Sequence, residues 1–416
     1  MRYDTIIIGG GLTGLTAGIA LARAQRRVAI LAKGLSRLNL NSGSLDLLGY
    51  DPEGNEVEKP LDAIARLDVS HPYRLIAGEA DLGQLAAQAR QLLSEAGVST
   101  HGDAVANHYR MTPIGTLKPS WLTLEGYARY ESRKLPWRSV TVANIKGYLD
   151  FPADFVAGNL LEQGVTARTV DIAVPELERH RYTPSEMRST AIATVLSRKS
   201  VIPSLAGLLN SNSAGSDAVL MPALVGLADE QALSALRSLV NKPLELVATM
   251  PPSVGGTRLH TQLRKHFIAL GGTFVLGSTV TAGSIANGSV TGLRAKNFPD
   301  QVIAADNYLL ASGSLSSGGI VASYERVYEP VFDLDVNCVT GREQWNLASV
   351  YDDQPYMRFG VVADGHLRAV KDGKPIGNLR VAGSVLAGNN AVRLASEGGV
   401  AMLTALHAAN QLLADK

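Results

Sequence analysis

Cysteine is almost missing from this sequence, in which Cys338 is the single example among 416 residues. One thiol excludes an intrachain disulfide framework, and it excludes an iron–sulfur cluster or zinc site ligated by cysteines of this chain alone. The sequence also has no excess of positive or negative residues, since it contains 39 basic and 38 acidic ones. The protein therefore has no net field that would attract nucleic acid or an anionic membrane surface.

Aromatic residues and long apolar runs are also scarce. Aromatics make up 6% of the chain, and no segment reaches the roughly 20 apolar residues that a membrane span needs. The chain is instead 46% hydrophobic and holds 41 glycines. This composition excludes disorder as the dominant state, and the length predicts more than one domain. Together these features are typical of an α/β nucleotide-binding protein.

The N-terminal residues predict a strand, a glycine turn, a helix and a second strand. Residues 3–8 and 28–32 are apolar strands, and residues 12–23 have helical composition. The uncharged run 5–22 could imitate a secretory signal, but its five glycines favour the folded interpretation. The turn matches G-x-G-x-x-G in the context that dinucleotide binding requires. We expect cofactor contacts from every residue of the turn, which are Gly9, Gly10, Gly11, Leu12, Thr13 and Gly14.

The last third of the chain completes the same pattern. It predicts a helix over 259–270, strands over 273–276 and 288–293 around an Asn287-Gly288 turn, strands over 306–313 and 379–384, and a final helix over 400–413. We therefore predict an α/β, Rossmann-like FAD/NAD(P)-binding fold. Its nucleotide domain is split between residues 1–71 and 252–416. Residues 72–251 form an inserted second domain for capping, substrate or partner binding.

Small-residue turns follow three of the predicted strands. Ligands of doubly wound sheets bind at the carboxyl ends of the strands, where glycine lets the backbone approach a phosphate. The alternative is tight turns without any ligand. Further cofactor contacts are expected from Gly313, Gly383, Ser384, Gly398 and Gly399.

The acidic residue that holds the ribose in many NAD and FAD proteins is absent. Lys33 follows the second strand, and no Asp or Glu occurs between Asp4 and Asp46. A cation there favours a terminal phosphate, as in FMN or NADP, although Lys33 could be a solvated charge. Ser42, Gly43 and Ser44 form a polar turn that either contacts the cofactor or is a plain loop.

Seven segments make the sequence similar to the B subunit of anaerobic glycerol-3-phosphate dehydrogenase. The resemblance runs from end to end in the same order. Its specific strings are Ser-Gly-Ser-Leu-Asp-Leu-Leu and Pro-Pro-Ser-Val, and agreement is weakest over 125–146. The segments are residues 2–12, 42–48, 71–73, 112–118, 220–223, 251–254 and 406–409.

The resemblance implies a flavoprotein with FMN as its cofactor. It implies a partner, the A subunit, that carries FAD, and an iron–sulfur C subunit that tethers the pair to the cytoplasmic face of the bacterial inner membrane. The complex would oxidise sn-glycerol 3-phosphate to dihydroxyacetone phosphate and pass electrons through quinone to fumarate or nitrate. The alternative is a non-catalytic electron relay or a structural protein that accompanies a catalytic A subunit.

Oxidation of glycerol 3-phosphate needs a base for the C2 hydroxyl and cations for the phosphate. His71 and His101 are candidate bases, and each could instead be structural. Lys118 and Arg258 are candidate phosphate ligands, and each could instead be a solvated charge.

Overall fold

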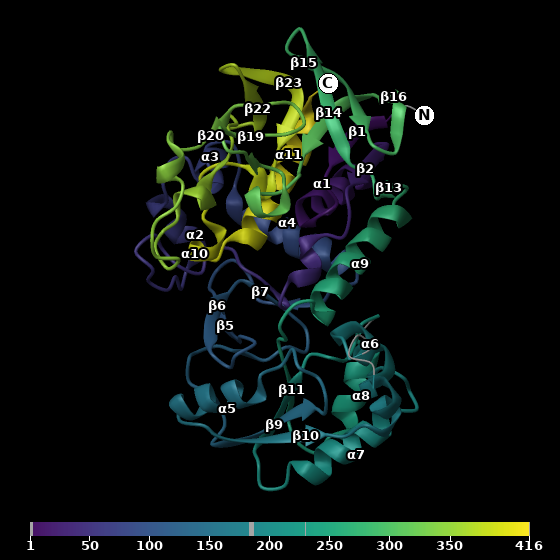
Figure 1. The fold of residues 1–416 in the computed structure, drawn as a ribbon. Helices are drawn as coiled ribbons and strands as arrows, with labels where there is room; N and C mark the ends of the chain where they lie inside the picture. The colour runs from purple at the N-terminus through teal and green to yellow at the C-terminus, as the bar shows by residue number, and fades with distance from the viewer. Residues whose placement is uncertain (1–2, 183–186, 229, 416) are drawn as a thin grey trace.

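The computed structural model describes residues 3–182, 187–228 and 230–415, and its largest element is a six-stranded sheet in the upper half of Figure 1. Both ends of the chain contribute strands, in the order β13-β2-β1-β17-β23-β22. All neighbours pair in parallel except β22, which is antiparallel to β23. The bounds are β1 Tyr3–Ile8, β2 Val28–Ala32, β13 Thr273–Leu276, β17 Ala305–Leu310, β22 Arg368–Lys371 and β23 Lys374–Val381.

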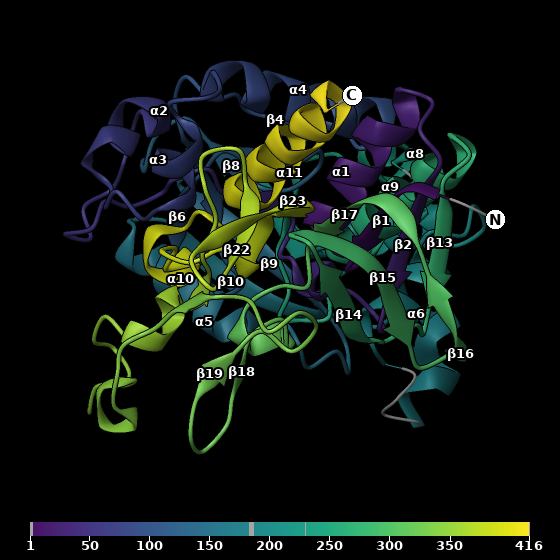
Figure 2. The same cartoon turned by 90° about the horizontal axis from the view of Figure 1, so that it is seen from above.

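The central strands are buried because both faces of the sheet are covered. Ile6, Ile7 and Ile8 of β1 are buried, as are all five residues of β2. Continuous apolar runs of this kind are typical of parallel strands between two layers. One layer is helical, and the other is an antiparallel sheet whose β15 contacts β17 and β23 (Figure 2). That sheet consists of β14 Val280–Ala286, β15 Ser289–Ala295 and β16 Phe298–Ile303.

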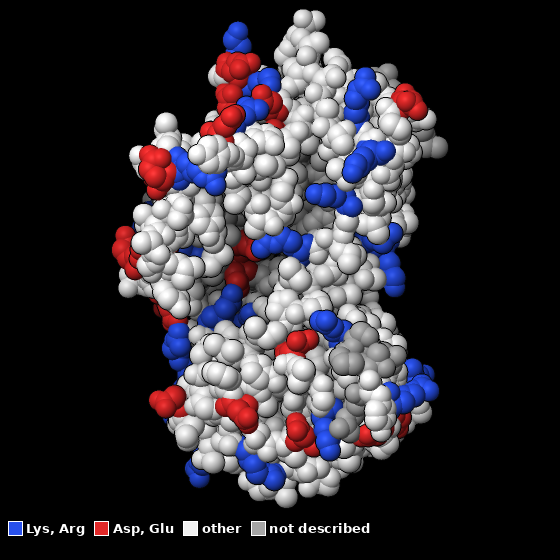
Figure 3. All heavy atoms as spheres, in the orientation of Figure 1, with Lys and Arg blue, Asp and Glu red and all other residues white. Residues whose placement is uncertain are grey.

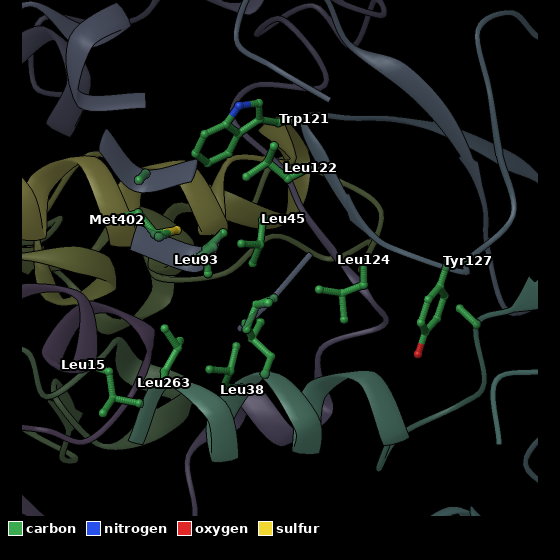
Figure 4. Packing of buried hydrophobic residues seen from close by; sticks show 14 of the residues in the cluster. Leu15, Leu38, Leu45, Leu93, Trp121, Leu122, Leu124, Tyr127, Leu263 and Met402 are labelled. Atoms are coloured by element: carbon green, nitrogen blue, oxygen red, sulfur yellow. The ribbon is translucent and has the colours of Figure 1, made fainter. Parts of the chain in front are cut away.

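The helical layer packs around α1. Its members are α1 Leu12–Arg23, α3 Pro72–Ile76, α4 Leu82–Glu95, α9 Val254–Ala269 and α11 Glu397–Ala414. α1 contacts α4, α9 and α11, and all but two of the α11 residues between 398 and 412 are buried. Figure 4 shows Leu15 of α1, Leu263 of α9 and Met402 of α11 in one hydrophobic cluster. Among the described residues, no helix is both long enough and apolar enough to cross a bilayer.

The middle of the chain forms a second parallel sheet, in the lower half of Figure 1. Its order is β10-β9-β11-β12, and every pair is parallel. Since β12 leads into α9 of the upper half, the carboxyl ends of all four strands face the upper half. The bounds are β9 Ser139–Ile145, β10 Thr166–Ile172, β11 Ala218–Pro222, β12 Leu244–Val247, α5 Ala153–Glu162, α6 Ser189–Leu196, α7 Ile202–Asn212 and α8 Gln231–Leu239.

Short antiparallel sheets join the two halves. They are β3-β7-β4, made of Ser44–Leu45, Leu122–Leu124 and Thr100–His101, and β6-β5-β8, made of Leu117–Ser120, His108–Met111 and Arg129–Tyr130. The remaining short elements are α2 Pro60–Ala63, α10 Ala391–Leu394, β18 Val321–Ala322, β19 Val327–Tyr328, β20 Val336–Asn337 and β21 Gly360–Val361.

Two expectations about the last third of the chain need correction. The domain boundary at residue 72 stays a prediction, and α3 and α4, which follow it, pack against α11. The Asn287-Gly288 turn joins β14 to β15, whereas residues 273–276 form the edge strand of the main sheet. α9 begins at Val254 because the Ser253 hydroxyl caps it, accepting a 2.9 Å hydrogen bond from the Gly256 amide.

Candidate functional site

The three predicted glycine turns meet at the carboxyl edge of β1, β17 and β23. Gly9 has φ +120°, and a side chain there would overlap the Ala311 carbonyl that follows β17. A methyl group on Gly14 would overlap the Gly9 carbonyl, and one on Gly383 would overlap the Thr13 hydroxyl. These positions therefore need glycine because separate segments of the chain touch there. Together they form a cradle at the switch point of the upper sheet.

The N-terminus of α1 opens into this cradle. Its N-cap residue, Gly11, has no capping side chain, and the first turn contains no acidic residue. A Cβ on Gly11 would have one near neighbour, the Ser36 hydroxyl at 3.6 Å. The first amides of a helix have no intrahelical partner and carry positive potential. The cradle therefore fits a phosphate group.

Two further predicted glycine positions have a packing explanation. The Gly399 amide donates to the Asp46 carbonyl at 2.8 Å, and a side chain on Gly399 would overlap the Tyr73 hydroxyl. Gly398 is packed closely against Leu45. The start of α11 is thus pressed against residues 45–47. The packing alone accounts for both glycines, and their contact with a cofactor stays a prediction.

Gly313 and Ser384 lie beside each other where β17 and β23 end. An ideal Cβ on Gly313 would lie 3.9 Å from the Ser384 hydroxyl, and Gly313 has φ +87°. Lys33 lies at the opposite side of the cradle, one residue past β2, and its side chain is exposed. No carboxylate in the described parts of the chain pairs with Lys33.

The Ser42-Gly43-Ser44 turn contacts two residues that sequence reasoning missed, Arg110 and Tyr127. The Arg110 guanidinium donates to the Ser42 hydroxyl at 2.5 Å and to the Ser42 carbonyl at 3.1 Å. The Tyr127 ring packs over Gly43 and leaves no room for a side chain there, and the φ of +90° at Gly43 also favours glycine. Burial raises the pKa of the Tyr127 hydroxyl, while the positive charges of Arg258 and Arg110 act in the opposite direction.

The structure brings Lys118 to the same turn but gives it a partner. Its ammonium group forms an ion pair with the Asp46 carboxylate, which also accepts a 2.8 Å hydrogen bond from Ser120. Arg258 is buried rather than solvated. Its guanidinium donates to the Gly226 carbonyl at 3.0 Å and lies 3.9 Å from Glu230. Both cations lie near the junction of the two halves, and their contact with substrate stays a prediction.

The structure buries His71 and engages its ring inside the protein. The ring is 1% exposed and caps α3, with Nδ1 accepting from the Tyr73 amide at 3.2 Å and Nε2 lying 3.1 Å from the Asn389 side-chain oxygen. Burial lowers its pKa to about 4. Both ring nitrogens have partners inside the protein, and a catalytic role of His71 stays a prediction.

His101 keeps an accessible ring. Its Nε2 lies 3.4 Å from the Glu131 carboxylate. Its ring packs edge to face against the His108 ring, with the two ring centroids 5.3 Å apart. His108 is buried, with Nε2 2.7 Å from the Thr123 hydroxyl, and burial lowers its pKa to about 4. His101 therefore remains the available one of the two candidate bases.

Comparison with known proteins adds family information to this geometry. The FAD binding domain family matches residues 4–399. The chain is 40% identical to the anaerobic glycerol-3-phosphate dehydrogenase B subunit of Yersinia enterocolitica, over 99% of this chain and 98% of that protein. It is 40% identical to the B subunit of Pectobacterium carotovorum over 99% of each. A 3-ketosteroid Δ1-dehydrogenase from Sterolibacterium denitrificans aligns over 100% of both chains, with 11% identity and a TM-score of 0.43.

Proposed function

The chain belongs to the FAD binding domain family and to the family of anaerobic glycerol-3-phosphate dehydrogenase B subunits, and from this premise we propose that it is the FMN-carrying subunit of such an enzyme. It is a flavoprotein oxidoreductase. The reaction would be oxidation of sn-glycerol 3-phosphate to dihydroxyacetone phosphate. The observation that carries the proposal is the glycine cradle at the open N-terminus of α1, in a chain related to these subunits over its whole length.

FMN is proposed as the flavin although the family description names FAD. The support is Lys33, an exposed cation at the place where an adenosine ribose would need a carboxylate. No acidic residue occurs between Asp4 and Asp46 to replace that carboxylate. Cofactor released by acid from the purified chain is therefore expected to be FMN. Chromatography that finds one FAD per chain would contradict this expectation.

Exchange of Lys33 for glutamate tests where the flavin phosphate lies. Lys33→Glu replaces attraction by repulsion, and a partly exposed ion contact contributes about 1 kcal/mol. Reversal roughly doubles the change, so FMN affinity should fall on the order of tenfold or more at low salt. The loss should shrink at high salt because charges are screened. Fluorescence titration of the apoprotein measures it. Unchanged affinity at low salt would leave the helix N-terminus alone as the phosphate site.

The side chains at the junction have distinct proposed roles. The flavin supplies the hydride acceptor for the C2 carbon. The first turn of α1 holds the flavin phosphate, Lys118 and Arg258 supply positive charge toward the substrate, and His101 is the proposed acceptor of the C2 hydroxyl proton. A base near neutral pH and fixed cations are what this oxidation requires.

The proposed partners are an FAD-bearing A subunit and an iron–sulfur C subunit, with the complex peripheral to the cytoplasmic face of the inner membrane. The relatives are named as subunits, which supports a complex of several chains. With Cys338 as its one cysteine, this chain needs a cluster-bearing partner to pass electrons through iron–sulfur centres to quinone.

Anaerobic mixing with glycerol 3-phosphate tests the proposed reaction. The visible absorbance of the flavin in the purified chain is followed with and without the A subunit. Bleaching by the chain alone supports direct oxidation, and bleaching only in the presence of the A subunit supports the electron relay. A purified chain that binds no flavin would contradict both and favour the structural alternative.

A further inference from the structure

Arg110 is a buried cation without a carboxylate partner. The residue is 3% exposed, and no acidic side chain in the described parts of the chain forms an ion pair with it. Three of its five N–H groups donate, to the Ser42 hydroxyl, the Ser42 carbonyl and the Met111 carbonyl, and its Nε has no hydrogen-bond partner. Buried charges are normally paired, so a buried guanidinium without a carboxylate partner is suited to binding an anion.

The surrounding charges do not neutralise Arg110. The carboxylate that acts electrostatically on Arg110 is Asp46, which is already engaged by the Lys118 ammonium and the Ser120 hydroxyl. Arg258 has its own partner in Glu230. Around the Ser42 turn, Arg110 and Lys118 therefore share the single carboxylate of Asp46. One positive charge is left without a negative partner. Figure 3 shows charged side chains of both signs in the hollow between the upper and lower halves.

Arg110 lies in β5, in one of the short sheets that join the upper and lower halves. Tyr127 connects the elements there, because its ring covers Gly43 and its hydroxyl lies against Gly255 at the start of α9. Arg258, on the same helix, reaches Gly226, which follows β11 of the lower sheet. Carboxyl edges of parallel sheets are the usual place for ligands. Ser42, whose hydroxyl accepts from Arg110, is partly exposed.

We propose that Arg110, oriented by Ser42, binds the phosphomonoester group of the substrate. The inference rests on the proposed function and replaces Lys118 and Arg258 as the first contact of that group. With three of its five donors used inside the protein, the guanidinium keeps two, the Nε–H and one N–H of Nη2, that phosphate oxygens can accept. The flavin phosphate has a separate place at Gly11, on different elements. Tyr127 and Lys118 then line the site without contributing an uncompensated charge.

Calorimetric titration of the flavin-loaded chain tests the assignment. The probes are inorganic phosphate, glycerol 3-phosphate and glycerol, and flavin content is measured for each variant. The parent should bind both phosphates and not glycerol. Arg110→Gln should weaken both by at least tenfold with its flavin content unchanged, and Arg110→Lys should lose less. Arg198→Gln, which changes an exposed arginine, should bind like the parent.

Several outcomes would overturn the assignment. The assignment is wrong if Arg110→Gln binds phosphate as tightly as the parent. It is also wrong if this variant loses flavin in proportion to its loss of phosphate binding, because Arg110 would then serve the cofactor. If Arg110→Gln does not fold, Ser42→Ala is the variant to measure. It keeps the positive charge of Arg110 and removes the hydroxyl that holds the guanidinium in place. Unchanged phosphate binding in that variant contradicts the proposal. Tight phosphate binding without flavin reduction by glycerol 3-phosphate would support the anion site and contradict the proposed function.

Discussion

Replacing Gly14 by alanine is expected to destabilise the folded protein by about 2 kcal/mol or more and to abolish flavin retention. The added methyl would overlap the Gly9 carbonyl, a backbone atom that is itself fixed against Ala311. Overpacking against atoms that cannot move costs about 1–3 kcal/mol. Helix propensity alone predicts the opposite sign, since alanine is favoured over glycine by about 1 kcal/mol inside a helix. Urea unfolding and the flavin-to-protein absorbance ratio measure the two effects.

Gly11→Ala is the matched control for this prediction. Its Cβ meets no atom closer than the Ser36 hydroxyl at 3.6 Å, and Gly11 has an ordinary φ of −83°. Stability should therefore change by no more than about 0.5 kcal/mol. Flavin affinity should still fall, because the methyl would project toward the phosphate cradle. Equal stability of the Gly11 and Gly14 variants would contradict the cradle geometry.

The protein is expected to lose stability as the pH falls from 7 to 5. Burial holds the pKa values of His71 and His108 at about 4, below the 6.5 of an unfolded histidine. The unfolded chain therefore binds protons below pH 6.5 that the folded chain refuses until about pH 4. Each histidine stabilises the fold fully above pH 6.5, and at pH 5 about 2 kcal/mol of that contribution is lost.

Urea unfolding at pH 7 and pH 5 tests this pH dependence. His71→Asn keeps an oxygen that can accept from the Tyr73 amide, so the cap of α3 survives while the titrating group is removed. The difference in unfolding free energy between the two pH values should shrink by about 2 kcal/mol, and His108→Asn should give a similar reduction. The double variant should add the two effects. A pH difference identical to that of the parent would show that neither histidine is excluded from protonation.

Local signals predicted the N-terminal fold well. The helix over residues 12–23 and the strand over 28–32 have the predicted bounds, because strand, glycine turn and helix follow each other within one short segment. The second parallel sheet was missed. Its β11, residues 218–222, is buried throughout, and a short apolar run carries no periodicity that separates a strand from a buried helix.

The sequence predicted the candidate site only at positions where close approach of backbone segments requires glycine. Gly9, Gly14 and Gly383 are marked in the sequence by turns after strands, and all three meet in the structure. Arg110 carries no such mark, since it meets Ser42 across 68 positions of sequence and looks like any arginine of an alternating strand. His71 did carry a signal. A residue before Pro72 at the first turn of a helix is an N-cap, and that pattern predicts the structural contact that His71 makes.

The division of the upper sheet between the two ends of the chain sets an order for folding during synthesis. β1 and β2 leave the ribosome first, yet the second neighbour of β1 begins at Ala305 and β23 ends at Val381. All strands of the lower sheet have been made once Val247 has emerged. The middle of the chain can therefore complete its sheet before the N-terminal strands can complete theirs. Until β17 has been made, the apolar Ile6, Ile7 and Ile8 stay on an unpaired edge, which is a template for pairing with other nascent chains. β1 and β2 are therefore the segment that a chaperone would have to shield while the remaining strands are made.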